Sequence, residues 1–265
     1  MEMAARIGAV LLILLSAVTF FAYAFQRMLI YYPAHASFES LGPFAEREDL
    51  LPWRDVRGNF IGWRSSQGAG IPVLIFHGNA GHALHRGDIV SRLNGIGITS
   101  PIYILEYPGY GARKGTPTES NLVKAAVEAI DLLGQQTILL GESLGTGVAC
   151  AAASLRAGSV RGLILLTPFD SLIAVAAKHY PLVPVGLILR DRYQSSRALQ
   201  TFNGPLAIIM AEKDDIIPEA STIRLFEAYS GPKKLWRIPS SGHNQVLQQI
   251  ADSELRSAYE FAKGG

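Results

Sequence analysis

A regular alternation of short apolar runs with amphipathic segments is the feature that most restricts how this 265-residue chain can fold. Strands joined by crossover helices produce such an alternation, and these strands pair in parallel with helices on both faces of the sheet. The fold class predicted here is therefore α/β, with a mostly parallel central sheet and flanking helices. The expected strands are two around Gly58-Asn59 within residues 53–64, and residues 71–76, 102–105, 137–140, 163–166, 206–210 and 235–238.

Between these strands, the sequence predicts helices near residues 83–93, 118–133, 144–155 and 219–229, and another near the C-terminus. Residues 170–204 break the pattern, because Tyr180-Pro181-Leu182-Val183-Pro184 interrupts two apolar segments. Ligands bind at the carboxyl ends of the strands in open α/β sheets. We therefore expect one domain over residues 28–265, with residues 170–204 forming a small helical cap over that edge.

Residues 7–25 carry no charge, and Arg6 and Arg27 flank them. At about 1.5 Å per residue, such a helix just crosses a hydrocarbon layer of about 30 Å. A cleaved signal peptide is the alternative, since Ala22-Tyr23-Ala24 has the small-x-small form of a cleavage site. The apolar stretch is long for a signal peptide, which favours a retained single-pass membrane anchor over residues 1–27. One arginine on each side does not set its orientation.

Composition removes several classes of function. The net charge is +2 and no run rich in Lys or Arg occurs, so we expect no nucleic-acid partner. Cys150 is the only cysteine, which excludes intramolecular disulfides and cysteine-based zinc sites and suits a core position. His82 and His85 lie one helical turn apart without an HExxH motif or a third ligand, so no metal is expected. Neither a dinucleotide fingerprint nor a Walker sequence occurs, and we expect no cofactor.

The segment Gly-Glu-Ser-Leu-Gly at residues 141–145 places Ser143 between a predicted strand and a predicted helix. A nucleophile elbow needs that junction, and the residues two positions away must be small because the turn is tight. Gly141 and Gly145 meet this need. A serine N-cap before a glycine-rich first turn is the alternative. The strand and helix context favours a nucleophile.

A serine nucleophile needs a base, and in a fold with this elbow the base follows the serine in the chain. Only His179 and His243 satisfy that order. His179 falls in the irregular segment, where a surface or substrate-facing role fits better. His243 follows the last predicted strand in a loop beside Gly242, which is the expected position of the base.

For the acid that orients the base, Asp214 is preferred because it lies four residues past a predicted strand, on a loop facing His243. We expect Asp215 to point elsewhere or to cap the following helix. Asp170 is the second candidate for the acid. Its alternative role is to be the N-cap of the first helix within residues 170–204. Asp191, which lies between two arginines, is interpreted as an ion-paired residue.

Two backbone N–H groups are expected to form the oxyanion hole. One belongs to Leu144, directly after the nucleophile, and the other to Asn79 in the turn His77-Gly78-Asn79-Ala80-Gly81. Gly78 gives this turn its HG-type form, and His77 is expected to shape the loop rather than to act as a base.

Eight segments show a family likeness, among them "FHGNAGH", "EYPGYGARKGTPTE", "LLGESLGTGVA", "AEKDDIIPEAS" and "GHN". With them, the chain resembles the α/β-hydrolase superfamily, and within it the membrane-tethered serine hydrolases of the serine-aminopeptidase-like group that includes protein depalmitoylases. The resemblance implies the α/β-hydrolase fold, with Ser143 as nucleophile, Asp214 as acid and His243 as base. Glu106 and Pro108 stand where Asp and Arg are usual in the family, and Ala211 replaces a glycine.

The expected activity is hydrolysis of a carboxylic ester or thioester, with a lipid or other acyl substrate, through an acyl-enzyme on Ser143. A serine aminopeptidase or amidase is the alternative, and it requires an acidic pair in the cap, where only Asp191 stands out. A non-catalytic binding protein on a hydrolase fold is a third hypothesis, although all three catalytic positions are filled. The expected localisation is the membrane.

Overall fold

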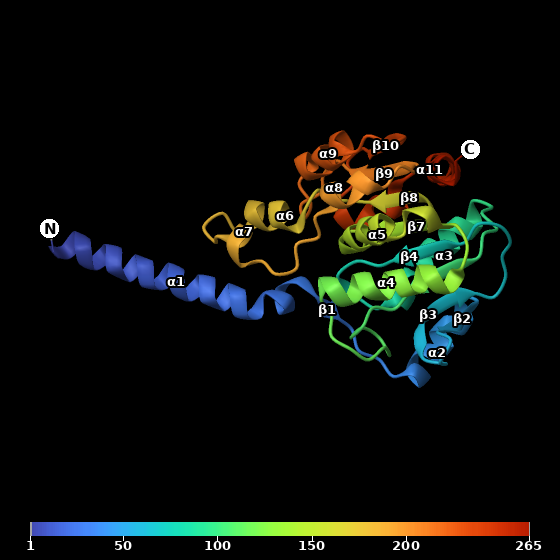
Figure 1. The fold of residues 1–265 in the computed structure, drawn as a ribbon, viewed down its shortest axis with the longest axis horizontal. Coiled ribbons are helices and arrows are strands. Elements are labelled where there is room, and N and C mark those ends of the chain that lie inside the picture. Colours follow the sequence, from blue (N-terminus) through green and yellow to red (C-terminus); the bar gives the residue numbers. More distant parts are fainter. Residues whose placement is uncertain (1, 265) are drawn as a thin grey trace.

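The computed structural model describes residues 2–264. An eight-stranded sheet lies at the centre of the domain, with strand order β10-β9-β8-β7-β4-β6-β3-β2 (Figure 1). The pairs from β10 across to β6 are parallel, whereas β3 and β2 join antiparallel at one edge. The predicted mostly parallel α/β-hydrolase fold is confirmed. The strands are β2 Leu50–Arg54, β3 Phe60–Ser65, β4 Val73–Phe76, β6 Ile102–Leu105, β7 Thr137–Glu142, β8 Val160–Leu166, β9 Leu206–Ala211 and β10 Lys233–Ile238.

Helices cover both faces of the sheet, which explains why its inner strands are almost continuously apolar. One buried cluster joins the sheet to α4, α5 and α9, and a second joins its opposite face to α2, α3, α10 and α11. The helical elements are α2 Phe38–Arg47, η1 Ala83–Arg86, α3 Gly87–Gly95, α4 Glu119–Leu133, α5 Leu144–Leu155, η2 Ala157–Ser159, α9 Glu219–Ala228, η4 His243–Gln245, α10 Val246–Gln249 and α11 Asp252–Lys263.

The register of the parallel strands brings the site loops to one edge of the sheet. Phe76 at the end of β4 pairs with Gly141 of β7, and Ile238 at the end of β10 pairs with Ala211 of β9. β8 lies between β7 and β9, and its Leu166 pairs with Ile209 of β9. The loops that follow β4, β7, β9 and β10 therefore begin at a similar level.

A long N-terminal helix, α1 Glu2–Ile30, projects from the domain (Figure 1). It is long and apolar enough to cross a membrane, a property that a signal sequence shares. Gln26 is its buried residue. After α1, the short strand β1 Tyr32–Pro33 pairs in parallel with β5 Ala80–Gly81. The sequence analysis predicted neither this pair nor α2, whose interior Gly42-Pro43 is typical of a turn.

Between β8 and β9 the chain forms four short helical elements and, within residues 170–204, no strand. They are α6 Leu172–His179, α7 Val185–Ile188, α8 Ser195–Ala198 and η3 Leu199–Thr201. α8 and η3 pack on α5, whereas α6 and α7 extend beside α1, away from the sheet (Figure 1). We refer to residues 170–204 as the cap segment.

Candidate active site

Ser143 lies at the sharp turn from β7 into α5, the position expected from the sequence. Its backbone has φ 51° and ψ −118°, a combination that side-chain-bearing residues rarely adopt. The N–H of Ser143 donates to the carbonyl of Leu166 at 3.0 Å, which ties the turn to the neighbouring strand. The strained turn places the serine at the carboxyl edge of the sheet.

Glycines on both sides of the turn make this close packing possible. A Cβ on Gly145 would overlap the carbonyl oxygen of Phe76 and lie 2.7 Å from that of His77. A Cβ on Gly141 would lie 2.7 Å from the carbonyl oxygen of Gly145. Gly78 faces the serine, since a Cβ added there would be 3.7 Å from that of Ser143. The three glycines named from the sequence therefore surround the turn.

The structure joins Ser143, His243 and Asp214 in one hydrogen-bonded row. Nε2 of His243 lies 2.9 Å from Oγ of Ser143, and its Nδ1 lies 2.7 Å from Oδ2 of Asp214. The side chains of His243 and Asp214 are 6% and 4% exposed. An ionised carboxylate only accepts hydrogen bonds, so Nδ1 carries the proton and the lone pair of Nε2 faces the serine hydroxyl.

The loop after β9 fixes the carboxylate of Asp214. Its Oδ1 accepts hydrogen bonds from the backbone N–H groups of Ile216 at 2.9 Å and Ile217 at 2.7 Å. Oδ2 is thereby left for His243. Two backbone donors on one oxygen hold the carboxylate plane, so the imidazole has a fixed orientation.

The other acidic residues considered from the sequence have different partners. Asp170 accepts from Nε of Arg224 at 2.7 Å, and Ser171 rather than Asp170 caps α6, so the capping role expected for Asp170 is wrong. No side chain caps α9, so Asp215 does not do so either. Asp191 is ion-paired as expected, but its partner is Arg27 of α1, at 3.0 Å, rather than a flanking arginine.

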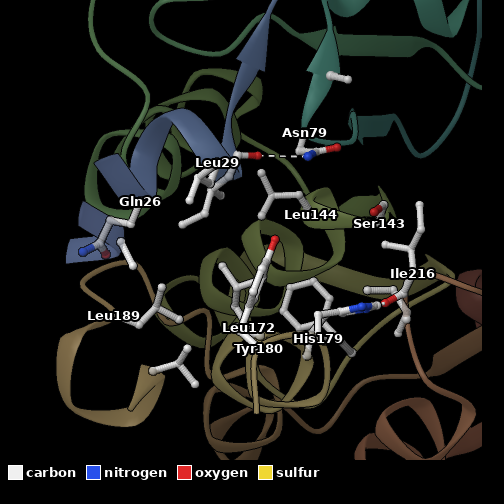
Figure 2. A pocket seen from close by; sticks show the side chains of 18 of the residues that line it. Gln26, Leu29, Asn79, Ser143, Leu144, Leu172, His179, Tyr180, Leu189 and Ile216 are labelled. Atoms are coloured by element: carbon white, nitrogen blue, oxygen red, sulfur yellow. Dashed lines mark hydrogen bonds between the residues drawn. The ribbon is translucent and has the colours of Figure 1, made fainter. Parts of the chain in front are cut away.

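The turn that carries Asn79 is fastened to the end of α1. The side-chain amide of Asn79 donates to the carbonyl of Ile30 at 2.9 Å, and its own carbonyl accepts from the N–H of Tyr32 at 2.9 Å. Asn79 and Leu144 line the same cavity as Ser143 (Figure 2). Within residues 2–264, the backbone N–H groups of Asn79 and Leu144 donate to no acceptor. Both groups are free to bind a developing oxyanion.

A large cavity of about 970 Å³ opens beside Ser143. Its volume is at the upper end of the range of about 300–1,000 Å³ typical of ligand sites. The walls come from α1, α6, α7 and the loops after β4 and β9, and most lining side chains are apolar (Figure 2). His179 lies in this wall with its Nε2 2.7 Å from the carbonyl oxygen of Ile216.

A second, smaller cleft of about 180 Å³ lies on another side of His243 and is polar. Arg86 forms an ion pair there with Glu142, the residue directly before the nucleophile. Asn244 and Gln248 also line this cleft. The sequence analysis missed the pair, although an acidic residue within a tight, partly buried turn is itself a sign that a cationic partner lies nearby.

Behind the Asn79 turn, His77 and Glu106 are fully buried and face each other, with Nε2 of His77 3.8 Å from Oε1 of Glu106. Burial lowers the pKa of His77 to about 3 and raises the pKa of Glu106 to about 8. Both groups are therefore neutral near pH 7, and the contact is not an ion pair. Nδ1 of His77 donates to the carbonyl of Gly78 at 2.8 Å, which links this buried pair to the turn.

The rings of His82 and His85 contact each other at a tilt of 30°, with their centroids 3.7 Å apart. Burial lowers the pKa values of both imidazoles, that of His82 to about 4. In the part of the chain that the structure describes, no three His, Cys, Asp or Glu side chains gather closely enough to hold a metal ion.

Comparison with known proteins gives the family. Residues 71–187 match the family model described as alpha/beta hydrolase fold. The chain belongs to the α/β-hydrolase superfamily. An uncharacterized protein of Mycobacterium tuberculosis is 34% identical over 253 residues, covering 89% of this chain and 86% of its own. The alpha/beta hydrolase domain-containing protein 17C of Xenopus laevis is 28% identical over 229 residues, covering 80% and 70%.

Among solved structures of this superfamily, an esterase of Pyrococcus furiosus matches with a TM-score of 0.65. The match covers 89% of this chain and 97% of the esterase, at 13% identity. Such a likeness concerns the fold alone, so the assignment of an activity depends on the site.

Proposed function

We propose that this protein is a serine hydrolase that cleaves a carboxylic ester or thioester, with Ser143 as nucleophile, His243 as general base and Asp214 as the acid that orients the base. The observation that carries the proposal is the hydrogen-bonded row from Asp214 through His243 to a serine on a strained turn beside a large cavity. A serine hydroxyl is a weak nucleophile unless a base of this kind takes its proton.

In the proposed mechanism, Oγ of Ser143 attacks the acyl carbon as Nε2 of His243 accepts the hydroxyl proton. The carbonyl oxygen takes up negative charge and binds the N–H groups of Asn79 and Leu144. One donor of this kind typically contributes about 10²–10³-fold to kcat. His243 then gives its proton to the leaving alcohol or thiol as the acyl-enzyme forms. Water, deprotonated by His243, attacks the acyl-enzyme and releases the carboxylic acid.

An acyl group with a substantial apolar part is the substrate class that the site favours. The cavity beside Ser143 is lined mainly by aliphatic and aromatic side chains, whereas the cleft beside Arg86 and Glu142 is polar. An apolar acyl chain suits the first space, and a polar leaving group or the hydrolytic water suits the second.

The aminopeptidase or amidase alternative has weaker support. It requires acidic side chains that can bind a substrate ammonium group. Asp191 in the cap segment is buried and paired with Arg27, and Asp170 is paired with Arg224. Neither carboxylate is available for a substrate.

We also propose the division of the chain into a membrane anchor over residues 1–27 and a hydrolase domain over residues 28–265, with residues 170–204 as its cap. The length and apolar character of α1 and the position of α6 and α7 beside the cavity support this division.

The test uses the full chain in detergent micelles, a fluorophosphonate probe and p-nitrophenyl butyrate. The wild-type protein is expected to react with the probe and to hydrolyse the ester, and Ser143→Ala is expected to do neither. Ser154→Ala, a matched control in α5 with a bond to Thr201, is expected to retain both activities. A wild-type protein that is folded but inert in both assays would refute the proposal.

A further inference from the structure

We infer that α1 is itself a wall of the acyl-binding cavity, and that the long acyl chain of a membrane-resident ester or thioester enters this cavity from the bilayer, between α1 and the cap segment. The inference rests on the proposed hydrolase function and names its substrate class. It assigns to the N-terminal helix a role in substrate binding beyond membrane attachment.

One face of α1 lines the cavity over the C-terminal half of the helix. The cavity is lined from Ala17 and Val18, through Phe21 and Ala22, to Leu29 and Ile30. A spacing of three and four residues places these side chains on one face of a helix. From residue 17 to residue 30, this face is about 20 Å long at about 1.5 Å per residue. Leu29 lies close to the turn that carries Asn79, near the foot of this wall (Figure 2).

The cavity-lining face of α1 shares residues with the uncharged segment. Residues 17–22 belong to the cavity face and also to the uncharged stretch at residues 7–25. If that stretch crosses the hydrocarbon layer, the upper part of the cavity lies at lipid depth. The opposite wall fits this position, because Leu182 and Leu187 of the cap segment are 81% and 84% exposed. Large apolar side chains exposed beside a spanning helix are typical of a membrane-contacting surface.

Within residues 2–264, the hydrogen bonds and the ion pair between α1 and the cap segment are found only at the foot of the wall. Gln26 donates to the carbonyl of Ile188 at 3.1 Å and accepts from the N–H of Arg190 at 2.6 Å. Arg27 pairs with Asp191 in the next position along the helix. Arg27 follows the uncharged stretch, where a lipid headgroup region would begin.

Above this polar foot, α1 and the cap segment face each other across the cavity, and apolar side chains of both line it. Apart from the backbone hydrogen bonds of α1 itself, no hydrogen bond or ion pair among residues 2–264 joins residues 2–22 to the remainder of the chain. An acyl chain can therefore lie between the two walls without breaking a polar contact between them. The chain would lie along α1, with its carbonyl carbon at Ser143.

The experiment uses the full-length protein in phosphatidylcholine vesicles and compares p-nitrophenyl palmitate with p-nitrophenyl butyrate. Ala22→Trp fills the cavity face of α1, and Ala24→Trp adds the same bulk on the exposed face as a matched control. Ala22→Trp is expected to lower the ratio of kcat/KM for palmitate to that for butyrate about tenfold or more, as filling an apolar pocket does. Ala24→Trp is expected to leave this ratio unchanged.

A second variant tests the direction of the acyl chain along the helix. Ala17→Trp lies farther from the foot of the wall than Ala22→Trp, so it should shorten the longest accepted acyl chain by less. A merely structural disturbance would lower hydrolysis of all chain lengths together and would overturn the inference. Equal effects of Ala22→Trp and Ala24→Trp on palmitate hydrolysis would also overturn the inference.

Entry from the bilayer has its own readout. At constant bulk concentration, the rate with palmitate is expected to follow the mole fraction of ester in the protein's own vesicles. A rate set only by bulk concentration would overturn the lateral route. A palmitoyl glycerol ester and an S-palmitoylated peptide in the same vesicles then distinguish a lipid from a protein as the source of the acyl group.

The outcomes separate this inference from the proposed function. Butyrate hydrolysis that survives Ser143→Ala contradicts the hydrolase assignment. Butyrate hydrolysis that requires Ser143, together with a palmitate-to-butyrate ratio unaffected by Ala22→Trp, contradicts only the role of α1.

Discussion

Replacing Glu106 by glutamine is expected to stabilise the protein near neutral pH. Burial raises the pKa of the Glu106 carboxyl from 4.5 to about 8, so the folded protein keeps it protonated where the unfolded chain has released its proton. Glutamine has a similar shape and carries no charge at any pH. Its carbonyl oxygen can accept the hydrogen bond that Oε1 receives from the N–H of Ala83 at 3.0 Å.

The size of the effect follows from the two pKa values. Below a pH of 4.5, the folded and unfolded proteins both hold the proton, and the carboxyl makes no pH-dependent contribution. Between 4.5 and about 8, each pH unit lowers the free energy of unfolding by about 1.4 kcal/mol, because only the unfolded chain is ionised. Near pH 7 the accumulated loss is about 3 kcal/mol, and it no longer grows once the pH exceeds the folded pKa of about 8.

The assay is thermal unfolding of the full chain in detergent micelles, followed by tryptophan fluorescence from about pH 5 to about pH 8. Near pH 5 the variant and the wild type should unfold at nearly the same temperature. Near pH 7 the Tm of Glu106→Gln should be higher by about 6–12 °C, since 1 kcal/mol shifts Tm by about 2–4 °C in a chain of this size. The lowered pKa of His77 affects both proteins and cancels in the difference.

Glu227→Gln is the matched control, because Glu227 is exposed on α9. Its Tm should follow that of the wild type over the whole range. Parallel Tm profiles for Glu106→Gln and the wild type would show that the buried carboxyl titrates alike in both states, and would refute the reasoning from desolvation.

Three further outcomes are expected. Gly145→Ala should lower the free energy of unfolding by about 2 kcal/mol or more in urea titrations, because the added methyl overlaps a backbone carbonyl. Gly158→Ala, where the added methyl meets open space, should leave the free energy of unfolding nearly unchanged. Equal effects of the two substitutions would contradict this reasoning. Asp214→Asn should lower kcat for p-nitrophenyl butyrate by about 10⁴-fold without loss of folding, and a change below tenfold would exclude an orienting role. Cys150, whose pKa burial raises to about 12, should react with Ellman's reagent only after unfolding, and rapid native reaction would contradict its burial.

Strong local patterns made most of the fold predictable. The buried strands are short apolar runs bounded by turn residues, so β7, β8, β9 and β10 lie where the sequence predicts them, with ends shifted by a few residues. Ser143 and Leu144 come directly after β7, and Asp214 and His243 come shortly after β9 and β10. Asn79 lies in the turn after β4. The structure gathers them at one edge, while their catalytic roles stay predictions until the variants are measured.

Contacts between residues far apart in the sequence were harder to predict. The sequence predicts an ion pair for Asp191 but not its partner, Arg27, which is 164 positions away, because the contact arises only when α1 lies against the cap segment. Arg86 at the end of η1 and Glu142 at the end of β7 are likewise brought together only by the folded sheet edge. The two-residue strand β1 has no periodicity to detect, and its pairing with β5 depends on the path of the chain after α1.

The left-handed backbone at Ser143 lowers the stability of the fold, although the proposed chemistry requires a serine at this position. Glycine relieves such a conformation, which costs other residues about 1–3 kcal/mol. A Ser143→Gly protein should therefore unfold at a higher temperature than its parent while losing the proposed nucleophile. Under the proposed function, a library screened for thermal stability alone would accumulate inactive variants at this position, so directed evolution of a more stable protein would also need an activity screen.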